Sequence, residues 1–370
     1  MKCRGAVLNA IGQPWSVEDL ELDEPRHNEV LVRLVASGVC HSDAHLMTGD
    51  LPNVLPTVGG HEGAGVVEAV GPGVTRVKAG DHIVTAFIPA CGVCRWCAQG
   101  MQYICDNGRD VNSGLMLDGT ARFHLSDGRG VGAMQRLGTF ANWLVIHEEQ
   151  AIRVDDDIPL EVGCLVACGV ATGWGSVVTA GGVRPGDTVL VLGVGGVGMN
   201  AVQGAANAGA SNIIAIDIVP YKLEVAREFG ATHGFASIDE ASSTLASLTN
   251  GQGADVAVVT VGRVTSDIIG QAFRAIRKAG TCVVTSVGEQ QDGIAINPFE
   301  LTSYTKVLRG ALYGNGSPTR EIPRLLQYYK DGRLRLDQLI TRRYSLEQIN
   351  DAFNDLASGR NIRGVVTHEH

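Results

Sequence analysis

The first 150 residues carry short apolar runs that are separated by glycine and proline. Runs of this length and residue type, bounded by turn residues, are typical of strands in an all-β domain. Four of them are predicted as strands, at residues 31–37, 63–71, 81–87 and 141–147. The pattern therefore predicts a β-rich, barrel-like domain at the start of the chain.

From about residue 170 the pattern changes to apolar strands that alternate with stretches of helical period, such as Pro220 to Phe229 and Ile268 to Arg277. Such alternation is typical of βαβ units around a parallel sheet. Six strands are predicted here, at residues 187–193, 212–217, 233–237, 254–262, 280–288 and 307–314. Because six strands fit a doubly wound sheet, we expect an α/β domain over residues 170–312.

The tail of the chain reads as two amphipathic helices followed by a last short strand at 363–368. Ser345 and Gln348 have the spacing of a capping box at the start of the second helix. Since the doubly wound sheet is complete without the tail, we expect the tail to return to the β-rich domain. That domain would then consist of residues 1–169 and 313–370.

Composition narrows the class of protein. A chain of 370 residues exceeds the size at which one core stops growing, which favours two domains. The net charge of -9 comes without a basic block, so neither nucleic-acid binding nor a polybasic membrane patch is supported. We also expect no membrane span, because the apolar stretches are broken by glycine and polar residues. The clustering of the nine cysteines favours metal binding in a reducing compartment, and we expect a cytoplasmic protein.

Four of the cysteines form a C-x₂-C-x₂-C-x₇-C pattern in a polar loop, namely Cys91, Cys94, Cys97 and Cys105. Four thiolates at this spacing can close a tetrahedral zinc site that stabilises a lobe without a large core. The alternatives are an iron–sulfur cluster, whose usual spacing differs, and thiols without a metal. The pattern predicts a structural zinc site.

A glycine-rich loop, GVGGVG, follows the strand at 187–193 and opens a helical stretch. In this context Gly193, Gly195 and Gly198 indicate a dinucleotide site. They allow a tight turn, close approach of the backbone to a pyrophosphate and close helix packing, while the helix N-terminus attracts negative charge. The loop is completed by Gly196 and Val197.

Asp217 ends the next strand, 19 residues beyond Gly198, where an acid can bind both ribose hydroxyls of NAD. A 2′-phosphate at ~4 Å from this carboxylate would be repelled by roughly 4 kcal/mol at an effective dielectric of about 20, so NAD is favoured over NADP. Lys222, one turn further, could reach a ribose hydroxyl. The alternative interpretation is an aspartate that caps a helix beside a merely tight turn.

Three residues far apart in the sequence have the types of a catalytic zinc site: Cys40, His61 and Cys168. Such a site takes three protein ligands and leaves one position open, and two cysteines with one histidine are an established set. Taken alone, these residues would more often be buried thiols and a core histidine. Cys164 lies four residues before Cys168, and we expect it to be a packing residue rather than a ligand.

The residues around these candidates resemble the zinc-dependent medium-chain alcohol dehydrogenases. The matching motifs are, in order, Cys40-His41-Ser42-Asp43, Gly60-His61-Glu62-Gly63, the four-cysteine loop, the stretch from Cys168 to Thr172, and GVGGVG. The resemblance covers essentially the whole chain. The resemblance implies a GroES-like catalytic domain, a Rossmann domain that binds NAD, an active site in the cleft between them, and two zinc ions per chain.

The resemblance also implies roles for single residues. The three candidate ligands would hold the catalytic zinc, Asp43 would orient the imidazole of His61, and Glu62 would lie beside the ligands. Ser42 would take the proton of the alcohol and His45 would pass it to solvent, through the ribose of the cofactor. The residues implied for the cofactor are His41 and Arg363 at the pyrophosphate, Thr172 near the nicotinamide, Gly193, Gly195, Gly196, Val197 and Gly198 in the loop, and Asp217 with Lys222 at the ribose.

The implied reaction is reversible hydride transfer between NAD and a primary, secondary or aromatic alcohol, which gives an aldehyde or ketone. Two enzymatic alternatives share the fold, metals and cofactor. One is an S-(hydroxymethyl)glutathione dehydrogenase, and the other is a nicotinoprotein that keeps NAD bound and passes hydride to a second acceptor. A third alternative is a quinone-reductase-like binding module without catalytic zinc, against which the three intact ligands argue.

Four residues bear on the substrate. Arg109 matches an arginine of the glutathione-adduct class, which favours the adduct. Leu51 and Asn53 stand where that class has acids, and a neutral pair disfavours it. Leu51 and Phe87 suggest an apolar wall for longer or aromatic alcohols. By resemblance we also expect a homodimer or homotetramer, in which the edge strand at 307–314 could pair with its copy.

Overall fold

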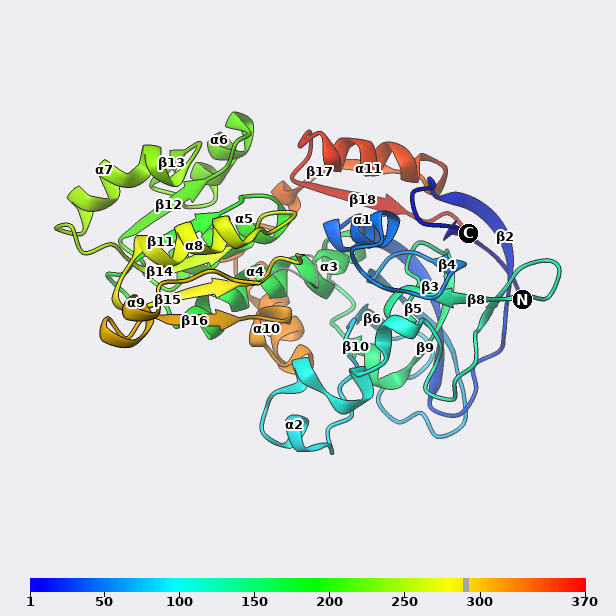
Figure 1. Ribbon diagram of the computed structural model, residues 1–370. Coiled ribbons are helices and arrows are strands. Elements are labelled where there is room, and N and C mark those ends of the chain that lie inside the picture. The colour runs from blue at the N-terminus through cyan, green and yellow to red at the C-terminus, as the bar shows by residue number, and fades with distance from the viewer. Residues whose placement is uncertain (289–292) are drawn as a thin grey trace. The chain divides into compact units, whose positions relative to one another are not determined.

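The computed structural model describes residues 1–288 and 293–370, which divide into two units (Figure 1). Unit 1 consists of Met1–Cys168 and Ser317–His370, and unit 2 of Gly169–Gly316. The tail lies in unit 1 because its last strand, β18 (Arg363–Thr367), pairs antiparallel with β3 (Glu29–Gly38).

Unit 1 is built on two sheets. Five strands close into a barrel in the order β1-β2-β7-β8-β4, and a second sheet runs β10-β6-β5-β3-β18-β17 with β9 also paired to β3. The remaining strands of unit 1 are β1 (Lys2–Leu8), β2 (Ser16–Leu22), β4 (Thr57–Val58), β5 (Glu62–Val70), β6 (His82–Thr85), β7 (Phe123–His124), β8 (Gly130–Ala133), β9 (Trp143–His147), β10 (Ala151–Arg153) and β17 (Ile340–Tyr344). β3 is buried along most of its length and has three partner strands, so it is the central strand of the second sheet.

The helices of unit 1 are α1 (His41–Thr48), α2 (Arg95–Ala98), α3 (Leu160–Leu165), α10 (Pro318–Lys330) and α11 (Ile349–Ala357). The predicted capping box is confirmed, with the Ser345 amide donating to Gln348 Oε1 at 3.0 Å in the turn that leads into α11. The buried residues of α11 include Ile349, Ala352 and Phe353, which have the spacing of one apolar helix face.

Unit 2 is a six-stranded parallel sheet in the order β13-β12-β11-β14-β15-β16, flanked by helices (Figure 1). Its strands are β11 (Thr188–Leu192), β12 (Asn212–Ile216), β13 (His233–Phe235), β14 (Ala254–Val259), β15 (Ile276–Val284) and β16 (Val307–Gly310). Its helices are α4 (Ala171–Gly175), α5 (Gly196–Asn207), α6 (Pro220–Glu228), α7 (Ile238–Leu248), α8 (Ser266–Ala275) and α9 (Pro298–Ser303). This strand order is that of a doubly wound dinucleotide-binding sheet, and the predicted fold class is confirmed.

The reason given for expecting no membrane span, that glycine and polar residues break every apolar stretch, does not hold at Leu160–Gly181. Within the described residues, the helical run Leu160–Gly181 is long and apolar enough, by length and composition alone, to cross a membrane. Its glycines do not interrupt the run, which continues through π-helical turns at Val166–Val170 and Ser176–Gly181. Of its most apolar window, 89% is buried in the folded chain, as is typical of a core helix.

The aromatic cluster of unit 1 generates a stability prediction. Phe353 is 6% exposed, and the centroid of its ring lies 5.6 Å from that of Trp15 and 6.0 Å from that of Phe140. We expect Phe353→Ala to lower the free energy of unfolding of unit 1 by about 3–5 kcal/mol, because it leaves a cavity between the two remaining rings. Urea unfolding followed by tryptophan fluorescence measures the change.

The matched control is Ile11→Ala, because the Ile11 side chain is 60% exposed. We expect it to change the free energy by less than about 0.5 kcal/mol. Equal effects of the two substitutions would contradict the assignment of Phe353 to the core of unit 1.

Candidate metal and cofactor sites

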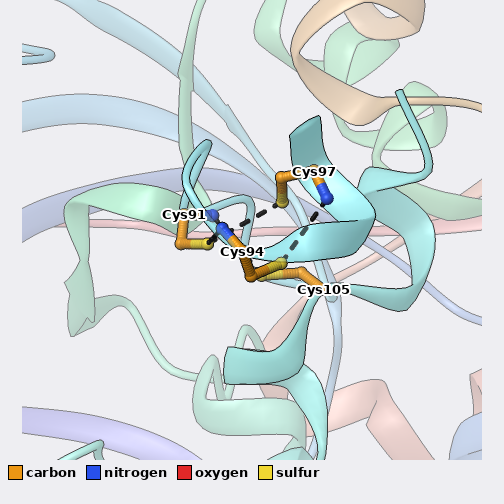
Figure 2. Close-up of side chains that lie close together, drawn as sticks. All are labelled: Cys91, Cys94, Cys97 and Cys105. Carbon is orange, nitrogen blue, oxygen red and sulfur yellow. Dashed lines mark hydrogen bonds between the residues drawn. The ribbon is translucent and has the colours of Figure 1, made fainter. Parts of the chain in front are cut away.

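The four cysteines of the polar loop converge in unit 1, with their side chains directed toward one another (Figure 2). The sulfur atoms of Cys91 and Cys97 lie 3.8 Å apart, and those of Cys94 and Cys105 lie 3.9 Å apart. A tetrahedral zinc ion with Zn–S bonds of about 2.3 Å places its sulfur ligands about 3.8 Å from one another. All four thiols are free, and these separations exceed an S–S bond of about 2.05 Å. The geometry fits zinc.

Backbone groups support this arrangement. The amide of Cys94 donates to Cys91 Sγ at 3.3 Å and that of Cys97 to Cys94 Sγ at 3.5 Å. Burial works against the Cys94 thiolate, but the backbone hydrogen bonds from Asp106 and Cys97 outweigh it and lower the pKa of Cys94 to about 6. Burial raises the pKa of Cys97 to about 11. Since zinc binds thiolates, loading this site must release protons, and acid must favour loss of the metal.

A second cluster brings together Cys40, His61, Glu62 and Cys168, whose ligand atoms all lie within 4.8 Å of one another and are buried. Cys40 follows the end of β3, and the His61–Glu62 pair opens β5. The two strands are antiparallel with Gly38 opposite Glu62, so their pairing places these residues side by side. Cys168 joins them from the π-helical turn after α3.

The ring of His61 is held in one orientation. Its Nδ1 lies 3.0 Å from Asp43 Oδ1, while Asp43 Oδ2 accepts the amide hydrogen of Cys40 at 3.1 Å. The other ring nitrogen, Nε2, is buried and has no hydrogen-bond partner among the described residues. Burial opposes the imidazolium, but the carboxylate of Asp43 outweighs it and raises the pKa of His61. A buried ring nitrogen that has no hydrogen-bond partner and lies close to two thiols is suited to bind a metal ion.

Hydrogen bonding between the thiols of Cys40 and Cys168 moves their pKa values in opposite directions. The hydrogen bond from Cys168 lowers the pKa of Cys40, and the same bond together with burial raises the pKa of Cys168. Cys164 is not in the cluster, because its Sγ donates to the carbonyl of Glu161 at 3.1 Å.

Glu62 and Arg363 form a buried ion pair beside the ligands, with exposed fractions of 0% and 3%. A Cβ atom on Gly38 would lie 2.0 Å from Glu62 Oε2, so a larger residue here would displace the ion pair, a constraint that the sequence did not reveal. Because Glu62 and Arg363 neutralise each other, the thiolates of Cys40 and Cys168 would balance the two positive charges of a zinc ion. The contact of Arg363 with a pyrophosphate stays a prediction.

The residues proposed for proton transfer lie on α1. Ser42 Oγ is 3.7 Å from Cys40 Sγ, and His45 is buried three residues further along the helix. His45 Nδ1 lies 3.1 Å from Asp50 Oδ2, a contact that no sequence motif predicted. His41, at the start of the helix, is exposed.

In unit 2, the glycine loop has the geometry that a dinucleotide requires. Gly193 has a φ of +87°, and a Cβ on Gly198 would lie 1.8 Å from the carbonyl oxygen of Gly193. A Cβ on Gly195 would meet no atom within 4 Å, which leaves open space at the N-terminus of α5. These local contacts are compatible with the parts predicted for the three glycines, whose contact with a cofactor stays a prediction, and Gly196 and Val197 lie in the first turn of the helix.

Asp217 is held against this loop. Its Oδ2 accepts the amide hydrogen of Val194 and its Oδ1 that of Val219, both at 2.9 Å. An ionised carboxylate has lone pairs left for two ribose hydroxyls. Lys222 lies in the first turn of α6 and Thr172 in α4, and their cofactor contacts stay predictions.

The four-cysteine geometry generates a prediction about metal content. With two clusters, the wild type should bind two zinc ions per chain. Cys94→Ser should lower this towards one and destabilise the lobe, because a structural zinc ion contributes on the order of 10–16 kcal/mol of binding energy. Elemental analysis and thermal unfolding measure the two effects. A folded wild type with one zinc ion or none would contradict the two-site interpretation, and Cys282→Ser, outside both clusters, is the control.

Two family models match the chain. Residues 26–156 match the alcohol dehydrogenase GroES-like domain, and residues 196–331 match the zinc-binding dehydrogenase domain. Among curated relatives, an NDMA-dependent alcohol dehydrogenase of Amycolatopsis methanolica is 51% identical, over 100% of this chain and 99% of its own length. Alcohol dehydrogenase B of Mycobacterium tuberculosis is 44% identical, over 100% of this chain and 99% of its own.

Solved structures with similar folds point to the same family. An alcohol dehydrogenase zinc-binding domain protein from Burkholderia ambifaria matches with a TM-score of 0.94 and 36% identity, and benzyl alcohol dehydrogenase from Acinetobacter calcoaceticus with 0.92 and 30%. Both alignments cover 100% of each chain. Since relatives at these identities span its full length, the chain belongs to the zinc-type medium-chain alcohol dehydrogenase family and is an oxidoreductase of that family.

Proposed function

We propose that this protein is an alcohol dehydrogenase that transfers hydride reversibly between NAD and primary, longer-chain or aromatic alcohols, with two zinc ions per chain. The observation that carries the proposal is the buried cluster of Cys40, His61 and Cys168, in which His61 Nε2 has no partner among the described residues. Zinc at such a site supplies a Lewis acid that lowers the pKa of an alcohol, and NAD supplies the hydride acceptor.

The residues of unit 1 have distinct parts in this proposal. The thiolates of Cys40 and Cys168 and the imidazole of His61 would hold the zinc ion, which would supply a Lewis acid for the alcohol. Asp43 keeps the Nδ1 hydrogen of His61, so that Nε2 faces the metal as a lone-pair donor. Ser42 takes the proton of the alcohol and His45 passes it on. Residues 1–169 and 313–370 would form the catalytic domain, and residues 170–312 the NAD domain.

The cofactor specificity rests on Asp217. Its carboxylate is fixed by two backbone amides beside the open space at Gly195. Such a carboxylate binds two ribose hydroxyls and repels a 2′-phosphate, which supports NAD. Lys222, His41, Arg363 and Thr172 are proposed as the further cofactor contacts.

The substrate class rests on the surroundings of the metal cluster. The ring of Phe87 is 5% exposed and stands edge-on to His61, with ring centroids 5.9 Å apart, which supports an apolar neighbourhood. Leu51 packs against the aromatic core cluster, and Asn53 is uncharged. Arg109 is exposed, and it remains the one residue that favours a glutathione adduct.

A second candidate is a nicotinoprotein, in which NAD stays bound and hydride passes to another acceptor. The observation that favours it is the 51% identity with a relative named NDMA-dependent. Both candidates use the same clusters and the same glycine loop, so they differ in whether NAD leaves between turnovers and in which molecule finally accepts the hydride.

We further propose a homodimer or homotetramer in the cytoplasm. β16 ends the sheet of unit 2, and the exposed apolar side chains near it include Phe299, Val307 and Leu312. An open strand edge with apolar neighbours favours pairing with a second copy.

Cys168→Ala should abolish alcohol oxidation and leave the four-cysteine site loaded, because two remaining protein ligands cannot hold the open tetrahedral geometry. Elemental analysis should show about half of the wild-type zinc, and the activity assay no turnover. Cys164→Ala, which changes a buried thiol outside the cluster, is the control. Retained turnover in Cys168→Ala would exclude the zinc mechanism.

Asp217→Gly should shift the preference from NAD towards NADP, since it removes both a ribose acceptor and a repulsive charge. Relief of the repulsion contributes at most roughly 4 kcal/mol to the shift, and the loss of the ribose acceptor adds to it. The ratio of kcat/KM with the two cofactors measures it, with Asp239→Gly on the exterior of α7 as a control. Unchanged discrimination would remove Asp217 from the cofactor site.

Hexanol and benzyl alcohol should exceed ethanol in kcat/KM, because each buried methylene gains about 0.8 kcal/mol. They should also exceed S-(hydroxymethyl)glutathione, and the reverse order would move the protein to the adduct class.

NAD released from the denatured, purified protein should be quantified beside turnover with added NAD and with NDMA. Stoichiometric bound NAD with turnover only on NDMA would establish the nicotinoprotein in place of the freely exchanging enzyme.

A further inference from the structure

We propose that Asp50 is a positioning residue for proton transfer, which sets the tautomer of His45 through a carboxylate–imidazole contact. The inference rests on the proposed function, in which His45 passes the proton of the alcohol to solvent. It adds a residue that no motif of the chain marks and that acts only through His45.

The turn after α1 brings Asp50 to the ring. The helix ends at Thr48, and Gly49 follows with a φ of +83°, a conformation that favours glycine. The chain then folds back, and the amide of Leu51 donates to the carbonyl of His45 at 3.0 Å. As a result, Asp50 Oδ2 lies 3.1 Å from His45 Nδ1, although the two residues are five positions apart.

The contact assigns the hydrogen of the imidazole. An ionised carboxylate only accepts hydrogen bonds, so Nδ1 must carry the hydrogen and Nε2 must be the basic nitrogen. The hydroxyl of Thr48 donates to the same Asp50 oxygen at 2.8 Å and restrains the carboxylate. The His45 side chain is 8% exposed and that of Asp50 20%, so the contact is shielded from water on the side of His45.

The position of this pair suits a proton relay. Ser42 and His45 are three residues apart on α1 and therefore share one face of the helix. Ser42 Oγ lies 3.7 Å from Cys40 Sγ, close to the metal cluster. Asp50 is more exposed to solvent than His45. In the proposed step, Nε2 of His45 accepts the proton, the carboxylate of Asp50 stabilises the imidazolium, and the ring returns to its neutral form when it gives the proton to water.

The test compares Asp50→Ala with the wild type in two ways. Nitrogen-15 NMR of histidine-labelled protein, with His45 assigned from a His45→Gln variant, should show the Nδ1–H tautomer in the wild type. It should show a shift towards the Nε2–H tautomer in Asp50→Ala. Steady-state kinetics should show a 10- to 100-fold loss in kcat with KM changed less than threefold, as expected for an outer residue that orients a functional imidazole.

Three comparisons separate positioning from a structural defect. Asp50→Glu, which keeps the carboxylate, should recover most of kcat, and a small imidazole buffer should partly restore Asp50→Ala but not alter the wild type. Asp127→Ala, which removes an exposed acid in the hairpin between β7 and β8, should leave both readouts unchanged. Nitrogen shifts of His45 that are identical in the wild type and Asp50→Ala would overturn the proposal.

A wild type that oxidises no alcohol with either acceptor would contradict the proposed function. The nitrogen shifts would then still decide whether Asp50 sets the tautomer, because that measurement needs no turnover. The two failures are therefore distinguishable.

Discussion

The antiparallel pairing of β3 with β5 is the constraint on which the metal cluster depends. It places Gly38 opposite Glu62, so that Cys40, two residues beyond the end of β3, lies beside His61 at the start of β5. The pairing contains two register shifts, between Leu31 and Val32 and between Leu34 and Ala36, and beyond the second shift the strands stay in register as far as Gly38. The absence of a Cβ on Gly38 lets the carboxylate of Glu62 approach the strand. The register at this end of the pairing therefore sets the spacing of Cys40 and His61.

Burying charged side chains would destabilise this arrangement, and each of them is therefore paired with an opposite charge or a hydrogen-bond partner. Glu62 is matched by Arg363 from β18, and Asp43 by the ring of His61 and the amide of Cys40. An isolated buried charge would be far more costly than any of these contacts is stabilising. This explains why the tail must return to unit 1, since it brings the arginine that neutralises the acid beside the ligands. The tail thus contributes to the site as well as to the aromatic core around Phe353.

The two metal clusters and the nucleotide loop show two ways in which sequence spacing relates to geometry. The four cysteines of the polar loop lie within a short segment, so local turns are sufficient to bring their sulfurs to tetrahedral distances. The glycines of GVGGVG act similarly, because each one permits a local backbone contact that a side chain would block. In contrast, Cys40, His61 and Cys168 depend on the whole of unit 1. No local turn could unite them.

The sequence alone determined the fold class, the six strands of unit 2, the four-cysteine loop and the glycine loop with Asp217, because periodicity and spacing are local properties. It also indicated Cys40, His61 and Cys168, but only through the resemblance of their flanking residues to a known family. Three features were decided by the tertiary structure alone: the unsatisfied Nε2 of His61, the ion pair of Glu62 with Arg363, and the contact of Asp50 with His45. The expectation that glycine breaks the apolar stretches likewise fails at Leu160–Gly181, where 89% of the most apolar window is buried in the folded chain. The physical reason is common to all four. Strand register, the return of the chain and burial depend on contacts between residues that are far apart in the sequence. A short window of sequence does not contain both partners of such a contact.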